Sequence, residues 1–174
     1  MIFVTVATHF LGFERLIKEI DKIASKIDEQ VIAQIGSTKY IPKNMQYFTF
    51  IDEEKLEELY ENSRIIITHA GAGTILKILK YKKPVIIVPR LKKFNEHVDD
   101  HQLELADALR NQNNAIVVYD INCLEDALKK IDTLNYIKVD QNKTLVSFLK
   151  GYIEKMNKSP HGVRAKKHPY EGRW

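Results

Sequence analysis

Cysteine is almost absent from this sequence of 174 residues, in which Cys123 is the single example. One cysteine excludes an internal disulfide and argues against a metal site built from thiolates. The composition therefore fits a protein of a reducing compartment, such as the cytoplasm. Hydrophobic residues make up 44% and charged residues 29% of the sequence, which is ordinary for a soluble globular domain.

Long apolar runs are also missing, and none approaches the about 18–20 residues that a membrane-spanning helix needs. The chain begins with a strand-like run, Ile2 to Val6, that has no basic segment before it. A secretory signal peptide is therefore not expected. We expect a cytoplasmic protein whose contact with a membrane is peripheral or made through a partner.

Net positive charge is missing from most of the chain despite a formal net charge of +4. From Lys150 onward there are seven Lys or Arg and two Asp or Glu, so the residues before carry a net charge of −1. The basic end favours a solvated tail over binding to anionic lipid or nucleic acid. We expect residues 1–157 to form one domain and residues 158–174 to be a disordered or vector-derived tail.

Strand-like and helix-like patterns alternate along the domain. Short runs rich in β-branched residues predict buried strands, and apolar residues at every third or fourth position predict helices. Strands are expected at residues 2–6, 30–35, 46–51, 65–68, 84–88 and 115–119, and helices at 13–27, 52–60, 74–81, 99–111, 122–132 and 143–156. This alternation predicts a single α/β domain of Rossmann-like form, with a mostly parallel, doubly wound sheet of six strands.

Ligands of such sheets bind beyond the carboxyl ends of the strands. Four polar segments are expected to converge there, at residues 7–9, 36–37, 69–74 and 90–101.

The glycine-rich segment His69-Ala-Gly-Ala-Gly-Thr74 is the most distinctive of these. Glycines let backbone N–H groups approach an anion, the following helix presents its positive end, and Thr74 adds a hydroxyl. The segment lacks the Gly-Lys-Ser/Thr ending of a Walker motif and the glycine spacing of a dinucleotide fingerprint. Phosphate binding and a plain strand-to-helix turn remain equally open at this stage.

A second polar cluster, Asn95 to Gln102, lies at the start of a predicted helix. Carboxylate and amide groups there suit contact with sugar hydroxyls. Helix capping by the aspartates is the next interpretation, and a metal site is a distant third, so no metal is expected.

Three smaller features border the predicted crevice. His9 is placed to act as a base or as a donor to phosphate, although a lone loop histidine is commonly only a polar surface residue. Arg90 and the pair Lys92-Lys93 offer charge to a diphosphate, but such lysines are usually just solvated. Phe50 and Ile51 end a strand and either flank a base or belong to the core.

Four motifs together resemble one known family, the C-terminal domain of glycosyltransferase family 28, whose type member is MurG of peptidoglycan synthesis. The motifs occur in the family's order, over about residues 2–110. They are Phe3-Val-Thr-Val6, Thr68-His-Ala-Gly-Ala-Gly-Thr74, Lys83-Pro-Val-Ile-Ile-Val-Pro-Arg90 and Glu96-His-Val-Asp-Asp-His-Gln-Leu103. Stand-alone members are most similar, namely bacterial PssE and the small catalytic subunit of the eukaryotic lipid-linked N-acetylglucosaminyltransferase.

The resemblance implies a UDP-sugar-dependent hexosyltransferase, with the sequence supplying the donor half of a two-domain GT-B fold. It implies an inverting transfer to a lipid-linked acceptor, with a membrane-anchored, PssD-like partner that binds this acceptor. It also implies that no cofactor is needed besides the UDP-sugar co-substrate, and that the chain lies at the cytoplasmic membrane face through its partner. No nucleic-acid partner is expected.

The resemblance also implies roles for particular residues. The diphosphate is expected at Thr8, Gly71, Ala72, Gly73 and Thr74, the sugar at Asp100, His101 and Gln102, and uracil near Phe50 and Ile51. His9 is the candidate base within the chain, unless the partner supplies the base. The helix expected at 143–156 serves either docking or core packing.

Two residues depart from the family pattern. Ala7 stands where glycine is usual, and Lys77 stands where many members carry a carboxylate that holds the ribose. The reversed charge at Lys77 supports a second hypothesis, a non-catalytic nucleotide-sugar-binding or regulatory subunit. A third hypothesis, a nucleotide-sugar epimerase, requires two domains in one chain, which 174 residues do not accommodate.

Overall fold

The structure of the protein is a computed structural model that describes residues 1–110, 115–131, 147 and 149–154. The chain divides into two compact units, residues 1–140 and 141–174. In the second unit the described residues, 147 and 149–154, are helical, within the helix expected at 143–156. The predicted domain boundary at 157 and the tail 158–174 lie outside the described residues.

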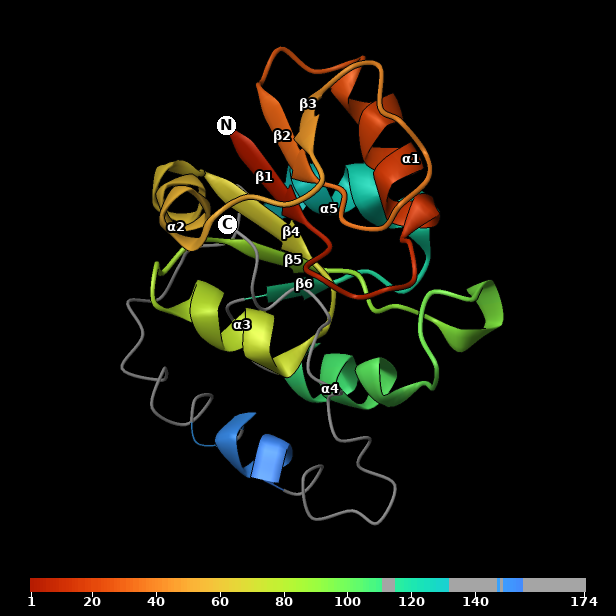
Figure 1. Cartoon of the computed structure of the whole chain (residues 1–174), viewed down its shortest axis with the longest axis vertical. Coiled ribbons are helices and arrows are strands. Elements are labelled where there is room, and N and C mark those ends of the chain that lie inside the picture. The colour runs from red at the N-terminus through yellow and green to blue at the C-terminus, as the bar shows by residue number, and fades with distance from the viewer. Residues whose placement is uncertain (111–114, 132–146, 148, 155–174) are drawn as a thin grey trace, which may run out of the picture. The chain divides into compact units, whose positions relative to one another are not determined.

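The first unit is built on one sheet in which every neighbouring pair of strands is parallel. The strands run in the order β3-β2-β1-β4-β5-β6 (Figure 1). Their bounds are β1 (Ile2–Thr5), β2 (Val31–Gln34), β3 (Gln46–Phe48), β4 (Ile65–Thr68), β5 (Val85–Ile87) and β6 (Ala115–Val117). Each overlaps a predicted strand, so the Rossmann-like fold class is confirmed.

Helices connect the strands in the predicted order. They are α1 (Glu14–Ala24), α2 (Glu53–Asn62), α3 (Ala72–Leu79), α4 (His101–Arg110) and α5 (Leu124–Ile131), with 3₁₀ turns η1 (Lys92–Phe94) and η2 (Ile121–Cys123). Asp52 caps α2 as predicted, because its carboxylate accepts the backbone N–H of Lys55 at 3.0 Å.

Helix α4 begins at His101 and not at the predicted residue 99. The carboxylates of Asp99 and Asp100 accept the backbone N–H groups of His101 and Lys92, at 3.1 and 3.0 Å. Asp99 thus satisfies the first free N–H group of α4, as a helix cap does, and Asp100 holds the residues ahead of the helix against the 3₁₀ turn η1.

Both faces of the sheet are covered. Helices α1 and α5 lie over one face, and α2, α3 and α4 lie over the other (Figure 1). Strand side chains alternate between these layers: Ile2, Val4 and Val6 join the core under α1, whereas Phe3 meets Tyr60 of α2 edge to face at 5.4 Å. Burial on both sides explains why β1 reads as a continuous apolar run.

The sheet reverses its direction of growth between β1 and β4. From β1 the chain builds outward through β2 and β3, then returns to build β4, β5 and β6 on the other side. The loops that leave β1 and β4 therefore diverge, and a crevice for ligands opens at this point in such sheets. Over the described ranges, no helix is long and apolar enough to cross a membrane.

Candidate functional site

The predicted diphosphate residues come from the two strands at this reversal. Thr5 of β1 is in register with Thr68 of β4, so the loops that follow these strands start from neighbouring positions at one edge of the sheet. One loop contains Thr8, and the other runs from His69 into α3. The structure thus brings Thr8 to the same edge of the sheet as Gly71, Ala72, Gly73 and Thr74.

The two glycines at the start of α3 serve different purposes. A Cβ on Gly71 would lie 2.1 Å from Cε1 of His69, so this position has no room for a side chain. A Cβ on Gly73 would meet nothing within 4 Å among the residues that the structure describes. Because the first N–H groups of a helix lack intrahelical acceptors, the open surface at Gly73 suits an anion.

His69 is held in place by two side chains. Its Nδ1 lies 3.2 Å from Nε2 of Gln102, and its Nε2 lies 3.3 Å from Oγ1 of Thr74. Burial, with a smaller contribution from the charge of Arg90, lowers the pKa of His69 to about 3. His69 is therefore a neutral imidazole at physiological pH.

Arg90 ties the loop after β1 to the loop after β5. Its guanidinium donates to the carbonyl oxygens of Val6, Leu11, Gly12 and Glu96 at 2.8–3.0 Å and is fully buried. Burial lowers the pKa of Arg90 to about 10, so it stays cationic at neutral pH. The sequence suggested that Arg90 offsets diphosphate charge, whereas its contacts here are with backbone carbonyls of the protein.

Arg15 is a residue of this region that sequence reasoning missed. Its Nε and Nη2 form a forked pair with the carboxylate of Glu96, each at 2.9 Å, and Nη2 also donates to the carbonyl of Pro89. Glu96 in turn accepts the N–H of Leu91 at 3.0 Å. The helical periodicity around Arg15 carries no sign of a contact 81 positions away in the chain.

His9 lies at the rim of the same edge. Its ring stacks on Phe10 and on His97, with centroids 4.7 and 4.8 Å apart. Its Nδ1 accepts the backbone N–H of Leu11 at 3.2 Å. Burial and then the charge of Arg90 lower the pKa of His9 to about 4, so this side chain is also neutral at pH 7.

The three predicted sugar contacts differ in exposure. Asp100 is exposed, but one carboxylate oxygen accepts the N–H of Lys92. His101 is 49% exposed, whereas Gln102 is 7% exposed and bonds to protein groups. Asp100 and His101 are therefore exposed to solvent, whereas Gln102 is buried.

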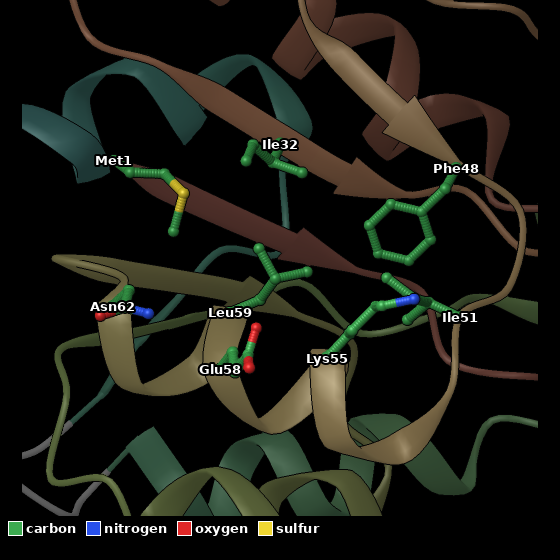
Figure 2. Close-up of a pocket in the computed structure, with 8 residues that line it drawn as sticks. All are labelled: Met1, Ile32, Phe48, Ile51, Lys55, Glu58, Leu59 and Asn62. Carbon is green, nitrogen blue, oxygen red and sulfur yellow. The ribbon is translucent and has the colours of Figure 1, made fainter.

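The two predicted base contacts point to different places. The ring of Phe50 is 54% exposed and would lie 3.9 Å from a Cβ on Gly36, which follows β2 at the carboxyl edge. Ile51 instead lines a groove of about 390 Å³ between the sheet and α2, opposite Ile32 and Phe48 (Figure 2). Phe50 is therefore the one of the two that borders the crevice.

A comparison with known families decides what kind of domain this is. The model of the glycosyltransferase family 28 C-terminal domain matches residues 1–156. The chain belongs to this family.

Relatives of the family 28 domain are named as an N-acetylglucosamine transferase or as a subunit of one. The UDP-N-acetylglucosamine transferase subunit ALG13 of Homo sapiens is 32% identical over 124 residues, which are 65% of this chain and 10% of that protein. The UDP-N-acetylglucosamine–N-acetylmuramyl-(pentapeptide) pyrophosphoryl-undecaprenol N-acetylglucosamine transferase of Prochlorococcus marinus (strain AS9601) is 25% identical over 151 residues, or 84% of this chain and 39% of that enzyme. The chain thus spans well under half the length of either relative.

Solved structures share the fold. The NMR structure of ALG13 aligns with a TM-score of 0.59 at 18% identity, covering 85% of this chain and 94% of that one. The crystal structure of MurG from Acinetobacter baumannii aligns with a TM-score of 0.51 at 16% identity, covering 85% of this chain and 49% of that one. The family 28 domain thus has the Rossmann-like fold of one half of a GT-B glycosyltransferase.

Ala7 adopts a backbone conformation that favours glycine. Its φ angle is 55°, in the left-handed region that glycine occupies without a steric cost. An alanine there costs roughly 1 kcal/mol relative to glycine. The loop after β1 therefore favours glycine at position 7.

Lys77 has a partner on a neighbouring helix. Its Nζ lies 2.7 Å from Oε1 of Glu53 in the first turn of α2, and both side chains are exposed. The positive charge of Lys77 therefore stands beside a carboxylate from another element. Within the described part of the chain, no group of three or more His, Cys, Asp or Glu side chains is placed to hold a metal ion.

Proposed function

We propose that this family 28 domain binds a UDP-sugar at the start of α3. In this proposal it is the catalytic, donor-binding subunit of a two-component inverting glycosyltransferase, which transfers a hexose to a lipid-linked acceptor in polysaccharide or glycan synthesis. The observation that carries the proposal is the open N-terminus of α3 at Gly73, beside the loop after β1. It occurs in a chain that belongs to a glycosyltransferase family.

Transfer of a sugar from a UDP-sugar requires that the negative charge of the departing nucleoside diphosphate be stabilised. Backbone N–H groups and the positive end of α3 supply this stabilisation without a metal ion or a further cofactor. Gly73 leaves room for phosphate oxygens, and Thr74 adds a hydroxyl at the next position. The exposed His101, and Asp100 beside it, are proposed to contact the donor sugar.

The role of His9 as the base stays a prediction. Because Nδ1 of His9 accepts the N–H of Leu11, the proton of the neutral ring resides on Nε2. An Nε2–H group favours donation to a phosphate oxygen, with Thr8 next to it in the loop. This geometry supports a base supplied by the partner, which would also bring the acceptor hydroxyl.

The proposed partner is a membrane-anchored subunit, similar to PssD, that binds the lipid-linked acceptor. Support comes from the human relative, whose name describes a subunit of a transferase, and from the match to one part of longer single-chain enzymes. The chain would then act at the cytoplasmic face of the membrane, held there by this partner.

Titration calorimetry of the full chain tests the donor site. UDP, UDP-N-acetylglucosamine, UDP-glucose and UDP-glucuronate are the ligands, and Gly73→Asp is the variant that places a carboxylate where the diphosphate is proposed. We expect micromolar binding of UDP that is lost in Gly73→Asp, because like charges repel. Equal binding by both proteins, or no binding by either, would count against a diphosphate site at α3.

A non-catalytic nucleotide-sugar-binding or regulatory subunit is the alternative, favoured by Lys77. Transfer of radiolabelled sugar to a lipid-linked acceptor, measured with the partner alone and with both proteins, separates the two proposals. A catalytic subunit gives transfer that needs both proteins and is lost in Gly73→Asp. Transfer that survives in Gly73→Asp would favour the regulatory role.

A further inference from the structure

The side-chain amide of Gln102 has a fixed orientation. Its Oε1 lies 3.1 Å from the backbone N of Ala70 and 3.0 Å from the backbone N of Arg90. A backbone N–H only donates, so the atom that faces both groups must be the amide oxygen. The amide nitrogen, Nε2, therefore faces His69.

This orientation determines which nitrogen of His69 carries the proton. The amide Nε2 only donates, so Nδ1 of His69, 3.2 Å away, must be the unprotonated acceptor. The proton of the neutral ring then lies on Nε2, which is 3.3 Å from Oγ1 of Thr74. Thr74 accepts this N–H, and its own hydroxyl hydrogen is left to point elsewhere.

We propose that Gln102 is a positioning residue that sets the direction of a series of hydrogen bonds, from Gln102 through His69 to Thr74. This series makes Thr74 present its hydroxyl hydrogen as a donor to an anion at the start of α3. That the anion is the diphosphate of a nucleotide sugar rests on the proposed function. Gln102 thus acts on the diphosphate through His69 and Thr74.

Burial allows only one direction of donation along the hydrogen bonds from Gln102 through His69 to Thr74. Gln102 and His69 are each 7% exposed, so water does not offer either side chain a full set of replacement partners. Reversing one bond would set two donors against each other, which is costly in a buried site. Gly71 belongs to the same arrangement, because a Cβ there would displace the His69 ring.

The isosteric variant Gln102→Glu tests the direction. One carboxylate oxygen still accepts from Ala70 and Arg90, but the other now accepts from His69 as well. The proton on His69 should therefore move to Nδ1, or both nitrogens should become protonated. With the proton on Nδ1, Nε2 of His69 becomes an acceptor, so Thr74 donates its hydroxyl hydrogen to His69 and no longer offers it to the anion. With both nitrogens protonated, Thr74 instead faces an imidazolium cation.

Long-range ¹H–¹⁵N NMR of the full chain without ligand reports the tautomer, with His69→Gln assigning the signals. We expect the Nε2–H form in the unmodified chain and its loss in Gln102→Glu. Calorimetry with UDP should show about ten- to hundredfold weaker binding for Thr74→Val, as expected for loss of one hydrogen bond to a charged group. The same loss is expected for Gln102→Glu where NMR shows the neutral Nδ1–H form of His69. Thr74→Ser, which keeps the hydroxyl, should bind within about threefold of the unmodified chain.

The outcomes distinguish this inference from the proposed function. An Nδ1–H tautomer in the unmodified chain would overturn the inference. So would UDP affinity unchanged in both Gln102→Glu and Thr74→Val. Failure of the unmodified chain to bind UDP would defeat the proposed function, while the tautomer of His69 would still decide the role of Gln102. If Gln102→Glu does not fold, two measurements still test the inference: the tautomer of His69 in the unmodified chain, and the UDP affinities of Thr74→Val and Thr74→Ser.

Discussion

At the scale of single residues, the candidate site is organised by buried polar side chains that bond to distant backbone. Arg90 donates to carbonyls 78–84 positions away, and Gln102 accepts from N–H groups 12 and 32 positions away. Such bonds place loops against one another as much as they stabilise the fold. Removing one partner leaves buried acceptors or donors without compensation, which costs more than the bond itself contributes.

The substitution Arg90→Met measures the cost of leaving buried carbonyl oxygens without a donor. The methionine keeps most of the volume and removes the donors to four carbonyl oxygens. We expect the free energy of unfolding to fall by about 3 kcal/mol. Urea denaturation checks this, with Arg110→Met as control, since Arg110 is exposed at the end of α4 and its loss should cost no more than about 0.5 kcal/mol. Equal losses in the two variants would contradict the role given to Arg90.

His69 should make the stability depend on pH. Its pKa is lowered to about 3 in the folded chain, so between pH 6.5 and 3 the unfolded chain binds this proton more readily than the folded one. Stability is therefore lost as pH falls through this window, by about 2 kcal/mol from pH 6.5 to 5. In His69→Gln the decline over this interval should be smaller by about that amount, as measured by urea denaturation at each pH. An identical decline in both proteins would show that His69 titrates normally.

At the scale of elements, two glycines with different surroundings lie at the start of α3, Gly71 at its N-cap and Gly73 in its first turn. Gly71 faces the ring of His69, and Gly73 faces open space. The sequence pattern Gly-Ala-Gly does not distinguish them, because both positions read as glycine at a strand-to-helix turn.

Matched alanine substitutions separate the two glycines. Gly71→Ala forces a Cβ to within 2.1 Å of the imidazole, so we expect a loss of at least about 2 kcal/mol in the free energy of unfolding. Gly73→Ala should be neutral or stabilise by up to about 0.5 kcal/mol, since alanine favours the helix. Thermal and urea unfolding measure both. A Gly73→Ala variant as unstable as Gly71→Ala would mean that the space at α3 is not open.

At the scale of the whole molecule, the sheet reversal between β1 and β4 places the candidate site on the larger of the two units. Loops after β1, β4 and β5 all reach one edge, where Arg90 and Gln102 hold them together. A ligand that bridges these loops should stabilise the folded chain as a whole, because it binds the folded and not the unfolded state.

UDP should therefore raise the unfolding temperature of the chain. At 100 times its Kd, UDP is expected to add about 2.7 kcal/mol to the free energy of unfolding. UMP at the same concentration should add less, since it offers α3 one phosphate and no diphosphate. Differential scanning calorimetry compares the two nucleotides, with Gly73→Asp as the control that should respond to neither. Equal shifts for UDP and UMP would argue against a diphosphate site.

Local patterning was sufficient to predict the fold. Runs such as Ile65 to Thr68 and the apolar spacing from Phe13 to Ile27 are properties of neighbouring residues, and strand–helix alternation leaves few topologies open. The glycine-rich segment at 69–74 was likewise visible, because a strand followed by Gly-Ala-Gly and a helix is a local signal. Helix ends were less accurate: α4 starts at His101, after residues whose aspartate side chains bond to the backbone N–H groups of Lys92 and His101.

The sequence by itself determined the order of the elements, the parallel sheet and the edge at which a ligand would bind. The tertiary structure decided which side chains face that edge. It turned Arg90 and Gln102 inward to bond to backbone, paired Arg15 with Glu96 and Lys77 with Glu53, and sent Phe50 and Ile51 to different surfaces. The reason is physical: periodicity reports burial along one element, whereas these contacts depend on which carbonyls, amides and charges of remote loops the closed sheet brings together.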